Sequence, residues 1–127
     1  MSNPEDCLFH QEHMWCRCEA DNHLVIGVSH HAQTSLGEVV FVELPEPGSS
    51  IRQGEALGII ESVKVVNDLI APADGTVVEV NEQLAETPTT VNDDPYGHGW
   101  MLRIKMESQE QLAELMNETD YLDSVKG

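Results

Sequence analysis

Basic side chains are scarce in this chain of 127 residues. Lysine and arginine together number 6, against 23 aspartates and glutamates, and the formal charge is -17. So much negative charge repels the phosphates of nucleic acids and of anionic membrane surfaces, and we expect neither as a partner. Basic proteins suit it better, although most of these carboxylates need only keep the protein soluble.

Cysteine and long apolar runs are scarce as well. Cys7, Cys16 and Cys18 make an odd number, and the last two lie too close along the chain to bridge without strain. We therefore expect no secreted disulfide framework. Residues 1–6 lack the apolar core of a secretion signal, and no run is long enough to cross a membrane. A cytoplasmic protein is the expectation that follows.

The hydrophobic pattern predicts a mainly β protein, and the length predicts one domain over residues 1–127. Gly37-Glu-Val-Val-Phe-Val-Glu43 recurs as Gly75-Thr-Val-Val-Glu-Val-Asn81, and both copies are rich in β-branched residues. Two copies are too few for a solenoid, so we expect two sheets packed on each other. Further strands are expected at residues 14–19, 23–28, 54–62, 65–71 and 99–106.

Short helices are expected at the periphery. Ser29 can cap a helix that reaches Leu36 and stops at Gly37. Ser108-Gln-Glu-Gln111 has a capping-box pattern that predicts another helix after the last strand. That helix would place three apolar residues on one face: Leu112, Leu115 and Met116. The tail beyond Tyr121 predicts one more short helix.

The first lysine of the chain, Lys64, lies inside the apolar stretch from Leu57 to Pro72, and the next lysine is Lys105. A strand, a short turn and a second strand would put the Lys64 side chain at a hairpin tip. Arginine would serve an ion pair equally well, but only lysine offers a primary amine for acylation. We therefore expect a covalent attachment site, the alternative being an exposed lysine that relieves repulsion between acids.

Four segments, in this order, carry a resemblance to a known family. They are Gly37-Glu-Val-Val-Phe-Val-Glu-Leu-Pro45, Glu61-Ser-Val-Lys64, Val91-Asn-Asp-Asp-Pro-Tyr-Gly97 and Gly99-Trp-Met-Leu-Arg-Ile-Lys105. Over nearly its whole length the chain resembles the H protein family of the glycine cleavage system. The resemblance implies a mainly β flattened barrel, or barrel-sandwich hybrid, with a lipoyl hairpin and short peripheral helices.

The resemblance also implies a cofactor and its surroundings. Lipoate would be joined to Lys64 by an amide bond, with Glu61, Ser62, Val63 and Asp68 as the other cofactor-binding residues. The family shelters its loaded arm in a surface groove, where acidic groups hold the cationic load. Asp68 matches one of these acidic positions. The second falls at Met14, whose thioether cannot form the ion pair that a carboxylate would.

The activity implied by the resemblance is that of a carrier, not of an enzyme. In the family, the lipoyl arm takes an aminomethyl group from glycine decarboxylase and presents it to an aminomethyltransferase. Dihydrolipoamide dehydrogenase then reoxidises the arm. A lipoate ligase or lipoyl transferase would attach the arm to the chain.

Two alternatives concern the arm itself. Biotin is the nearest chemical rival of lipoate, but its carrier domains usually place methionines where this chain has Val63 and Val65. A lipoyl carrier could also serve sulfur oxidation with a heterodisulfide-reductase-like complex, as H-protein-like lipoate-binding proteins do. Met14, the paired histidines and the three cysteines slightly favour that second route.

Two further clusters predict less. His10, His13, Cys16 and Cys18 offer enough donors for zinc, but their spacing differs from that of known zinc knuckles, so we expect no metal. Two half-buried thiols on one strand face are the commoner outcome. The adjacent His30 and His31 predict a solvated helix face, because no nucleophile motif accompanies them.

Overall fold

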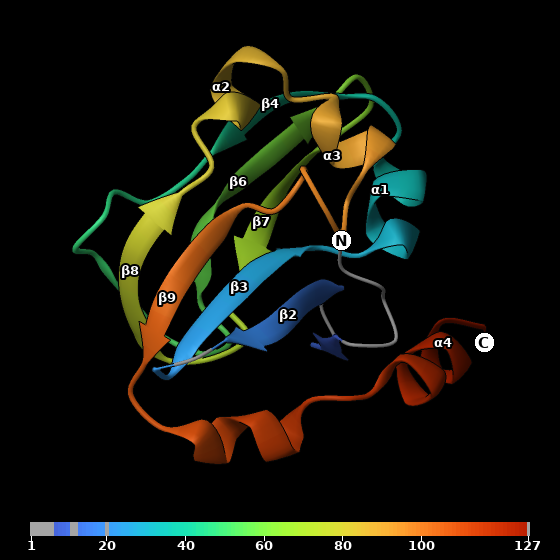
Figure 1. The fold of residues 1–127 in the computed structure, drawn as a ribbon. Helices are drawn as coiled ribbons and strands as arrows, with labels where there is room; N and C mark the ends of the chain where they lie inside the picture. The colour runs from blue at the N-terminus through green and yellow to red at the C-terminus, as the bar shows by residue number, and fades with distance from the viewer. Residues whose placement is uncertain (1–6, 11–12, 20, 127) are drawn as a thin grey trace.

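A computed structural model describes residues 7–10, 13–19 and 21–126 (Figure 1). The described part does not include residues 1–6, on which the expected location partly rests. It also does not include residues 11 and 12, inside the His10–Cys18 cluster. In the described residues no helix is both long and apolar enough to span a membrane.

Two antiparallel sheets make up the core of the fold. The larger has the order β1-β2-β3-β9-β8-β5, and the smaller has the order β4-β6-β7. The larger sheet comprises β1 (Leu8–Phe9), β2 (Met14–Glu19), β3 (His23–Val28), β9 (Leu102–Met106), β8 (Gly75–Val80) and β5 (Ser50–Ile51). The smaller comprises β4 (Val39–Glu43), β6 (Ala56–Ser62) and β7 (Val66–Ile70).

The two copies of the sequence repeat lie in different sheets, because β4 carries the first copy and β8 the second. The prediction of two packed sheets is thus confirmed, although they do not join into one closed barrel. Their facing sides form the main apolar core. Both sheets contribute to it, for instance with Ile26 and Ile104 from the larger and Ile60 and Leu69 from the smaller.

Strand β3 is buried on both faces, as its nearly continuous apolar sequence indicates. Its inner face joins the main core, and its outer face carries Val25. There Val25 belongs to a second apolar cluster with Phe9, Trp15 and Tyr121. Tyr121 comes from helix α4 (Glu118–Lys126), so the C-terminal helix covers the far side of the larger sheet (Figure 1).

The first helix follows its prediction closely. Helix α1 spans His30–Leu36, and the Ser29 side chain accepts a hydrogen bond from the backbone N–H of Ala32 at 3.1 Å. Gly37 ends the helix with a φ of 81°, a conformation that glycine adopts without strain. Two more short helices, α2 (Gln83–Glu86) and α3 (Thr90–Asp93), lie in segments where no helix was predicted.

The helix predicted after Ser108 was wrong in type and length. A 3-10 helix, η2, spans Gln109–Glu114, and Leu115 is already extended. Met116 instead exchanges backbone hydrogen bonds with Phe9 of β1, at 2.7 and 2.8 Å. This strand-like pairing explains why the three apolar residues do not share one helical face. The tail helix does form, but α4 begins before Tyr121.

Gly27 of β3 leaves room for the indole ring of Trp15 on the neighbouring strand β2. It pairs with Trp15 across the two strands, and a Cβ at position 27 would lie 2.7 Å from the indole ring. The Trp15 Nε1 donates a hydrogen bond to the Pro95 carbonyl at 2.8 Å, which holds the ring in place. The ring therefore cannot move aside without losing that bond.

We predict that Gly27→Ala lowers the free energy of unfolding by about 1 to 3 kcal/mol, because the added methyl overpacks the site. Urea denaturation followed by tryptophan fluorescence measures the change. Thr76→Ala, at an exposed position of β8, is the control and should cost less than about 1 kcal/mol. Equal stability of Gly27→Ala and the natural chain would contradict the close contact.

Candidate functional site

Lys64 stands at the tip of the hairpin that joins β6 to β7, and its side chain is exposed. One serine closes this turn. The backbone N–H of Ser62 donates to the Val65 carbonyl at 2.8 Å. The Ser62 hydroxyl oxygen accepts hydrogen bonds from the backbone N–H groups of Lys64 and Val65, both at 3.2 Å. A buried side chain thus fixes the backbone that presents the amine.

The tip is also tied to the turn between α1 and β4. The backbone N–H of Val63 donates to the Glu38 carbonyl at 3.0 Å. The Lys64 stem crosses Gly37, since its Cε would lie 3.1 Å from a Cβ at that position. The amine therefore starts from a defined place beside the end of α1.

Asn92 of α3 holds that same turn from the other side. Its Oδ1 accepts a hydrogen bond from the Val39 backbone N–H at 2.8 Å. Its Nδ2 donates to the Gly37 carbonyl at 2.7 Å and to Oε1 of Gln33 at 3.0 Å. Sequence reasoning missed this role, because the segment Val91–Gly97 gives no sign of which distant turn its asparagine contacts.

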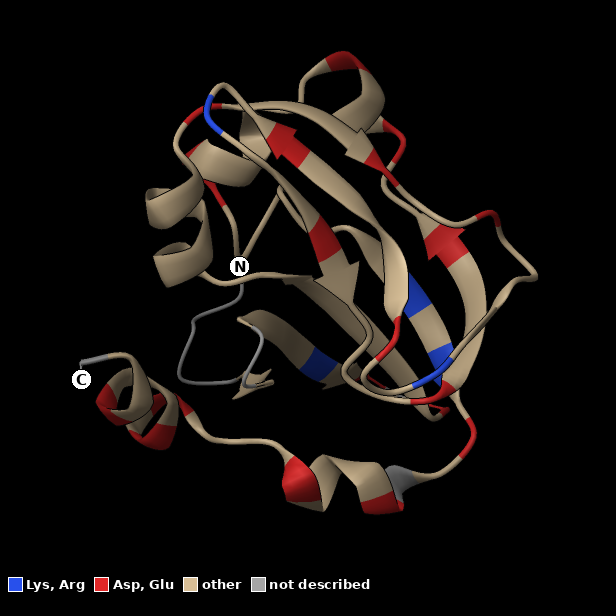
Figure 2. Ribbon diagram, turned by 180° about the vertical axis from the view of Figure 1, so that it is seen from behind, with Lys and Arg blue, Asp and Glu red and all other residues tan. Residues whose placement is uncertain are grey.

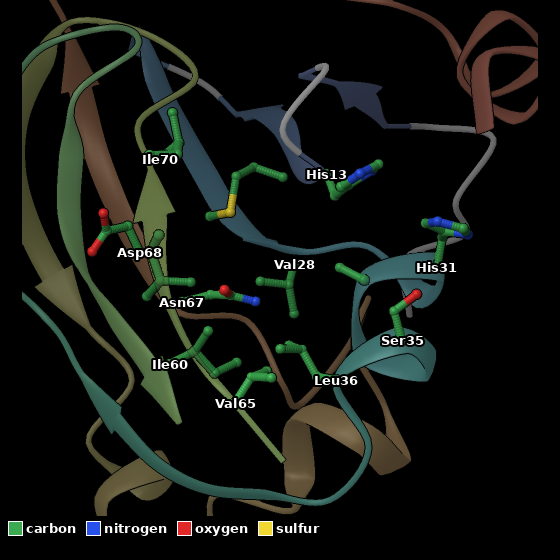
Figure 3. Close-up of a pocket in the computed structure, with 13 residues that line it drawn as sticks. His13, Val28, His31, Ser35, Leu36, Ile60, Val65, Asn67, Asp68 and Ile70 are labelled. Atoms are coloured by element: carbon green, nitrogen blue, oxygen red, sulfur yellow. The ribbon is translucent and has the colours of Figure 1, made fainter. Parts of the chain in front are cut away.

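A groove of about 590 Å³ lies beside the hairpin (Figure 3). The hairpin and α1 form two of its walls, and the start of β2 with the end of β3 forms the third. Its lining residues are His13, Met14, Val28, His31, Ala32, Ser35, Leu36, Ile60, Val65, Asn67, Asp68, Leu69 and Ile70. Leu36 and Val65 lie at the end of the groove nearest Lys64. Val65 follows Lys64 in the chain, and Leu36 precedes Gly37, which the Lys64 stem crosses.

The groove has an apolar floor with polar groups around it. Met14, Ile60 and Leu69 are buried lining residues, each at most 2% exposed. His13 and His31 lie together, with 5.1 Å between their ring centroids. Among the described residues that line the groove, Asp68 is the one acid. On the helix face that was expected to be solvated, His30 is exposed, and His31 is half-buried and lines the groove.

The predicted site residues do not all lie in one place. Lys64, Ser62 and Val63 form the hairpin tip, and Asp68 lies on the groove. Glu61 lies outside the set of groove residues, in register between Phe41 of β4 and Val66 of β7. Three exposed apolar side chains lie close to Lys64 in the chain: Val63, Val65 and Val66.

The cysteines do not share one environment. Cys16 is fully buried and Cys18 is exposed, so the expectation of two half-buried thiols was wrong. Burial raises the pKa of the Cys16 thiol, and nearby Cys18 and Cys7 raise it further. Burial also raises the pKa of Cys18. No three metal-ligating side chains gather anywhere in the described segments.

We predict that Asn92→Ala lowers the free energy of unfolding by about 2 to 4 kcal/mol, because three hydrogen bonds are lost at a partly buried turn. Urea denaturation measures the effect. Asn67→Ala, at an exposed position of β7, is the matched control and should change stability by less than about 0.5 kcal/mol. Similar losses in the two variants would mean that Asn92 does not hold the turn.

Comparison with known proteins identifies the family. The model of the glycine cleavage H-protein family matches residues 7–127. The glycine cleavage system H protein of Carboxydothermus hydrogenoformans is 45% identical over 118 residues, which cover 93% of this chain and 90% of that protein. The H protein of Rubrobacter xylanophilus is 50% identical over 109 residues, 86% of each chain.

Solved structures agree. The crystal structure of a glycine cleavage system H protein from Mycobacterium marinum matches this fold with a TM-score of 0.90 and 35% identity. The match covers 98% of this chain and all of that one (100%). The predicted fold class is thereby confirmed. The chain belongs to the glycine cleavage H-protein family, whose members are carriers and not enzymes.

Proposed function

We propose that this chain is the lipoyl carrier of a glycine cleavage system and that Lys64 is its attachment site. The observation that carries the proposal is an exposed primary amine on a turn that is held from both sides. The names of the relatives agree with glycine cleavage and do not favour the sulfur-oxidation alternative.

The groove beside Lys64 fits a long, mostly apolar arm. Its lining includes Val65, just before β7, and reaches Ile70 at the end of β7, and five residue steps of an extended chain span about 16 Å. Its floor is apolar, and its polar groups lie around that floor. When bound, lipoate supplies the sulfur atoms that carry the transferred group.

The residues of the chain would then have separate tasks. Ser62 and the Glu38 carbonyl hold the attachment point, so that the arm starts from one place. Amide formation removes the charge of Lys64, so its stem can lie on the apolar lining without desolvating a cation. Asp68 would attract a cationic load at the groove.

The surface suits basic partner enzymes. Figure 2 shows acidic residues spread over both sheets and the peripheral helices, with few basic residues among them. The family membership implies partnership with the enzymes of glycine cleavage. We propose glycine decarboxylase, aminomethyltransferase and dihydrolipoamide dehydrogenase as those partners, a lipoate ligase or lipoyl transferase as the modifying enzyme, and the cytoplasm as the location.

We predict that a lipoate ligase adds one lipoyl group to the purified chain and that Lys64→Arg abolishes the addition. Arginine keeps the positive charge but lacks an acylable primary amine. Intact mass before and after incubation with lipoate and ATP measures the change. Lys105→Arg, at an exposed position of β9, is the matched control and should still accept one group. Labelling that survives Lys64→Arg would rule out the assignment.

We predict that Met14 makes the loaded arm less well protected than a carboxylate would. Met14→Glu should slow loss of the load by roughly three-fold or more, because the cationic load favours the ionised carboxylate at this buried position and forms a charge-assisted hydrogen bond with it. Decay of the carried group after loading with glycine and glycine decarboxylase measures protection.

Met14→Gln is the control for that experiment, because it matches glutamate in size and polarity but adds no charge. It should behave like the natural chain. Equal protection in Met14→Glu and Met14→Gln would show that charge at this position does not matter. Failure of all three proteins to load, with the arm still reduced and reoxidised by dihydrolipoamide dehydrogenase, would point to another lipoate-dependent route.

A further inference from the structure

One hydroxyl group links the C-terminal helix to two walls of the groove. The Tyr121 hydroxyl of α4 lies 2.7 Å from Nδ1 of His13. The same hydroxyl lies 2.7 Å from Oγ of Ser29. His13 and Ser29 precede β2 and α1, the elements that form two of the groove walls. A residue far along the chain from the hairpin thus contacts both.

The ring of Tyr121 is held firmly enough to place that hydroxyl. Tyr121 is 1% exposed. Its ring stacks on Phe9, with centroids 4.6 Å apart and an angle of 6° between the planes. The ring also meets His13 edge to face, with centroids 5.7 Å apart. The ring can therefore stay in place when only the hydroxyl is removed.

Each of the two contacts fixes a different part of the groove. Ser29 is the N-cap of α1, and its Oγ also accepts the Ala32 N–H. Its position sets where α1 begins, and α1 presents His31 and Ser35 to the groove. His13 has a φ of 70°, which is unfavourable for a residue other than glycine. The Tyr121 hydroxyl is one of the contacts that hold the His13 ring beside His31.

The hydrogen-bonding capacity of the three groups matches the arrangement. A tyrosine hydroxyl has one proton to donate and can also accept, and a serine hydroxyl has the same capacity. Ser29 can donate to Tyr121 while Tyr121 donates to His13. Burial raises the pKa of Tyr121 more than the hydrogen bond with Ser29 lowers it, so the hydroxyl keeps its proton at neutral pH.

We infer that Tyr121 is a positioning residue for the groove: the backbones of His13 and Ser29 are already joined by a hydrogen bond of 2.9 Å, and the Tyr121 hydroxyl fixes the His13 ring and the Ser29 cap so that the arm on Lys64 can lie beside them. This inference rests on the proposed function, because it concerns the same arm. It assigns α4 a task beyond covering the larger sheet. Contact between α4 and the arm is not required.

The test compares ¹H–¹⁵N NMR spectra of each protein before and after lipoylation. Amides of Val63 and Val65 report attachment at the hairpin, and amides of Ser35 and Asp68 report an arm seated in the groove. In the natural chain both sets should shift. In Tyr121→Phe the hairpin shifts should persist. The groove shifts should fall about three-fold or more, because loss of the bridging hydrogen bonds lowers the population of the seated arm.

Asn117→Ala is the matched control. The Asn117 side chain accepts a hydrogen bond from the Asp120 backbone N–H at 2.8 Å at the start of α4. Its loss weakens the same helix but leaves the Tyr121 hydroxyl in place, so the groove shifts should remain. Replacement of Tyr121 by 4-aminophenylalanine restores a polar group at the same position and should recover the groove shifts. All spectra are recorded where urea denaturation shows each variant to be folded.

The outcomes separate the two proposals. Unchanged groove shifts in Tyr121→Phe would overturn the inference, and so would an equal loss in Asn117→Ala, which would show that helix docking alone matters. Groove amides that do not respond to lipoylation of the natural chain would also overturn it, while the attachment at Lys64 stands. If intact mass shows no lipoyl group on Lys64, the proposed function fails and the inference fails with it.

Discussion

The hydrogen bond from Val63 to the Glu38 carbonyl is the contact on which the site depends. It joins the tip of the hairpin between β6 and β7 to the turn between α1 and β4. Because of it, the Lys64 stem crosses Gly37, and the neighbouring Leu36 lines the groove. The hairpin already forms one wall of the groove, and this junction also ties its tip to the α1 wall.

The small number of basic residues makes their placement informative. Arg103 pairs with Glu19 and Glu79, and Arg52 pairs with Asp74 and Glu107. Such exposed pairs add little stability each, but they neutralise acids that the fold brings close together. Over the described residues, no carboxylate lies within ion-pair distance of Lys64. Its amine thus remains accessible for chemistry while these two arginines take structural roles.

The groove depends on its lining and on the contacts behind it. Its shape comes from three elements that the fold places around one apolar floor, and the matched crystal structure has the same fold. Met14 belongs to the apolar floor, and the His13 ring, which lies against His31, is held by Tyr121 from outside the groove. The environment of the arm therefore depends on residues behind the lining as well as on the lining itself.

Much of the fold could be predicted because the evidence for it is local. Alternation of apolar residues marked the long strands, the Ser29 cap and Gly37 marked α1, and the repeat marked two sheets. The resemblance of four ordered motifs added the family, which the comparisons confirmed. The position of Lys64 between two strands was likewise readable from adjacent residues. For these features, the interactions that decide the structure lie within a few residues of one another.

Other features depend on partners far along the chain, so local patterns could not indicate them. The 3-10 helix stops short because Met116 pairs with Phe9, and Cys16 and Cys18 differ because only one lies under the opposite sheet. Asn92 and Tyr121 gain their roles from contacts more than fifty positions away. The sequence by itself determined the long strands, α1 and where an amine is offered. Only the tertiary structure decided what surrounds that amine, because packing brings together groups whose separation in sequence carries no periodic signal.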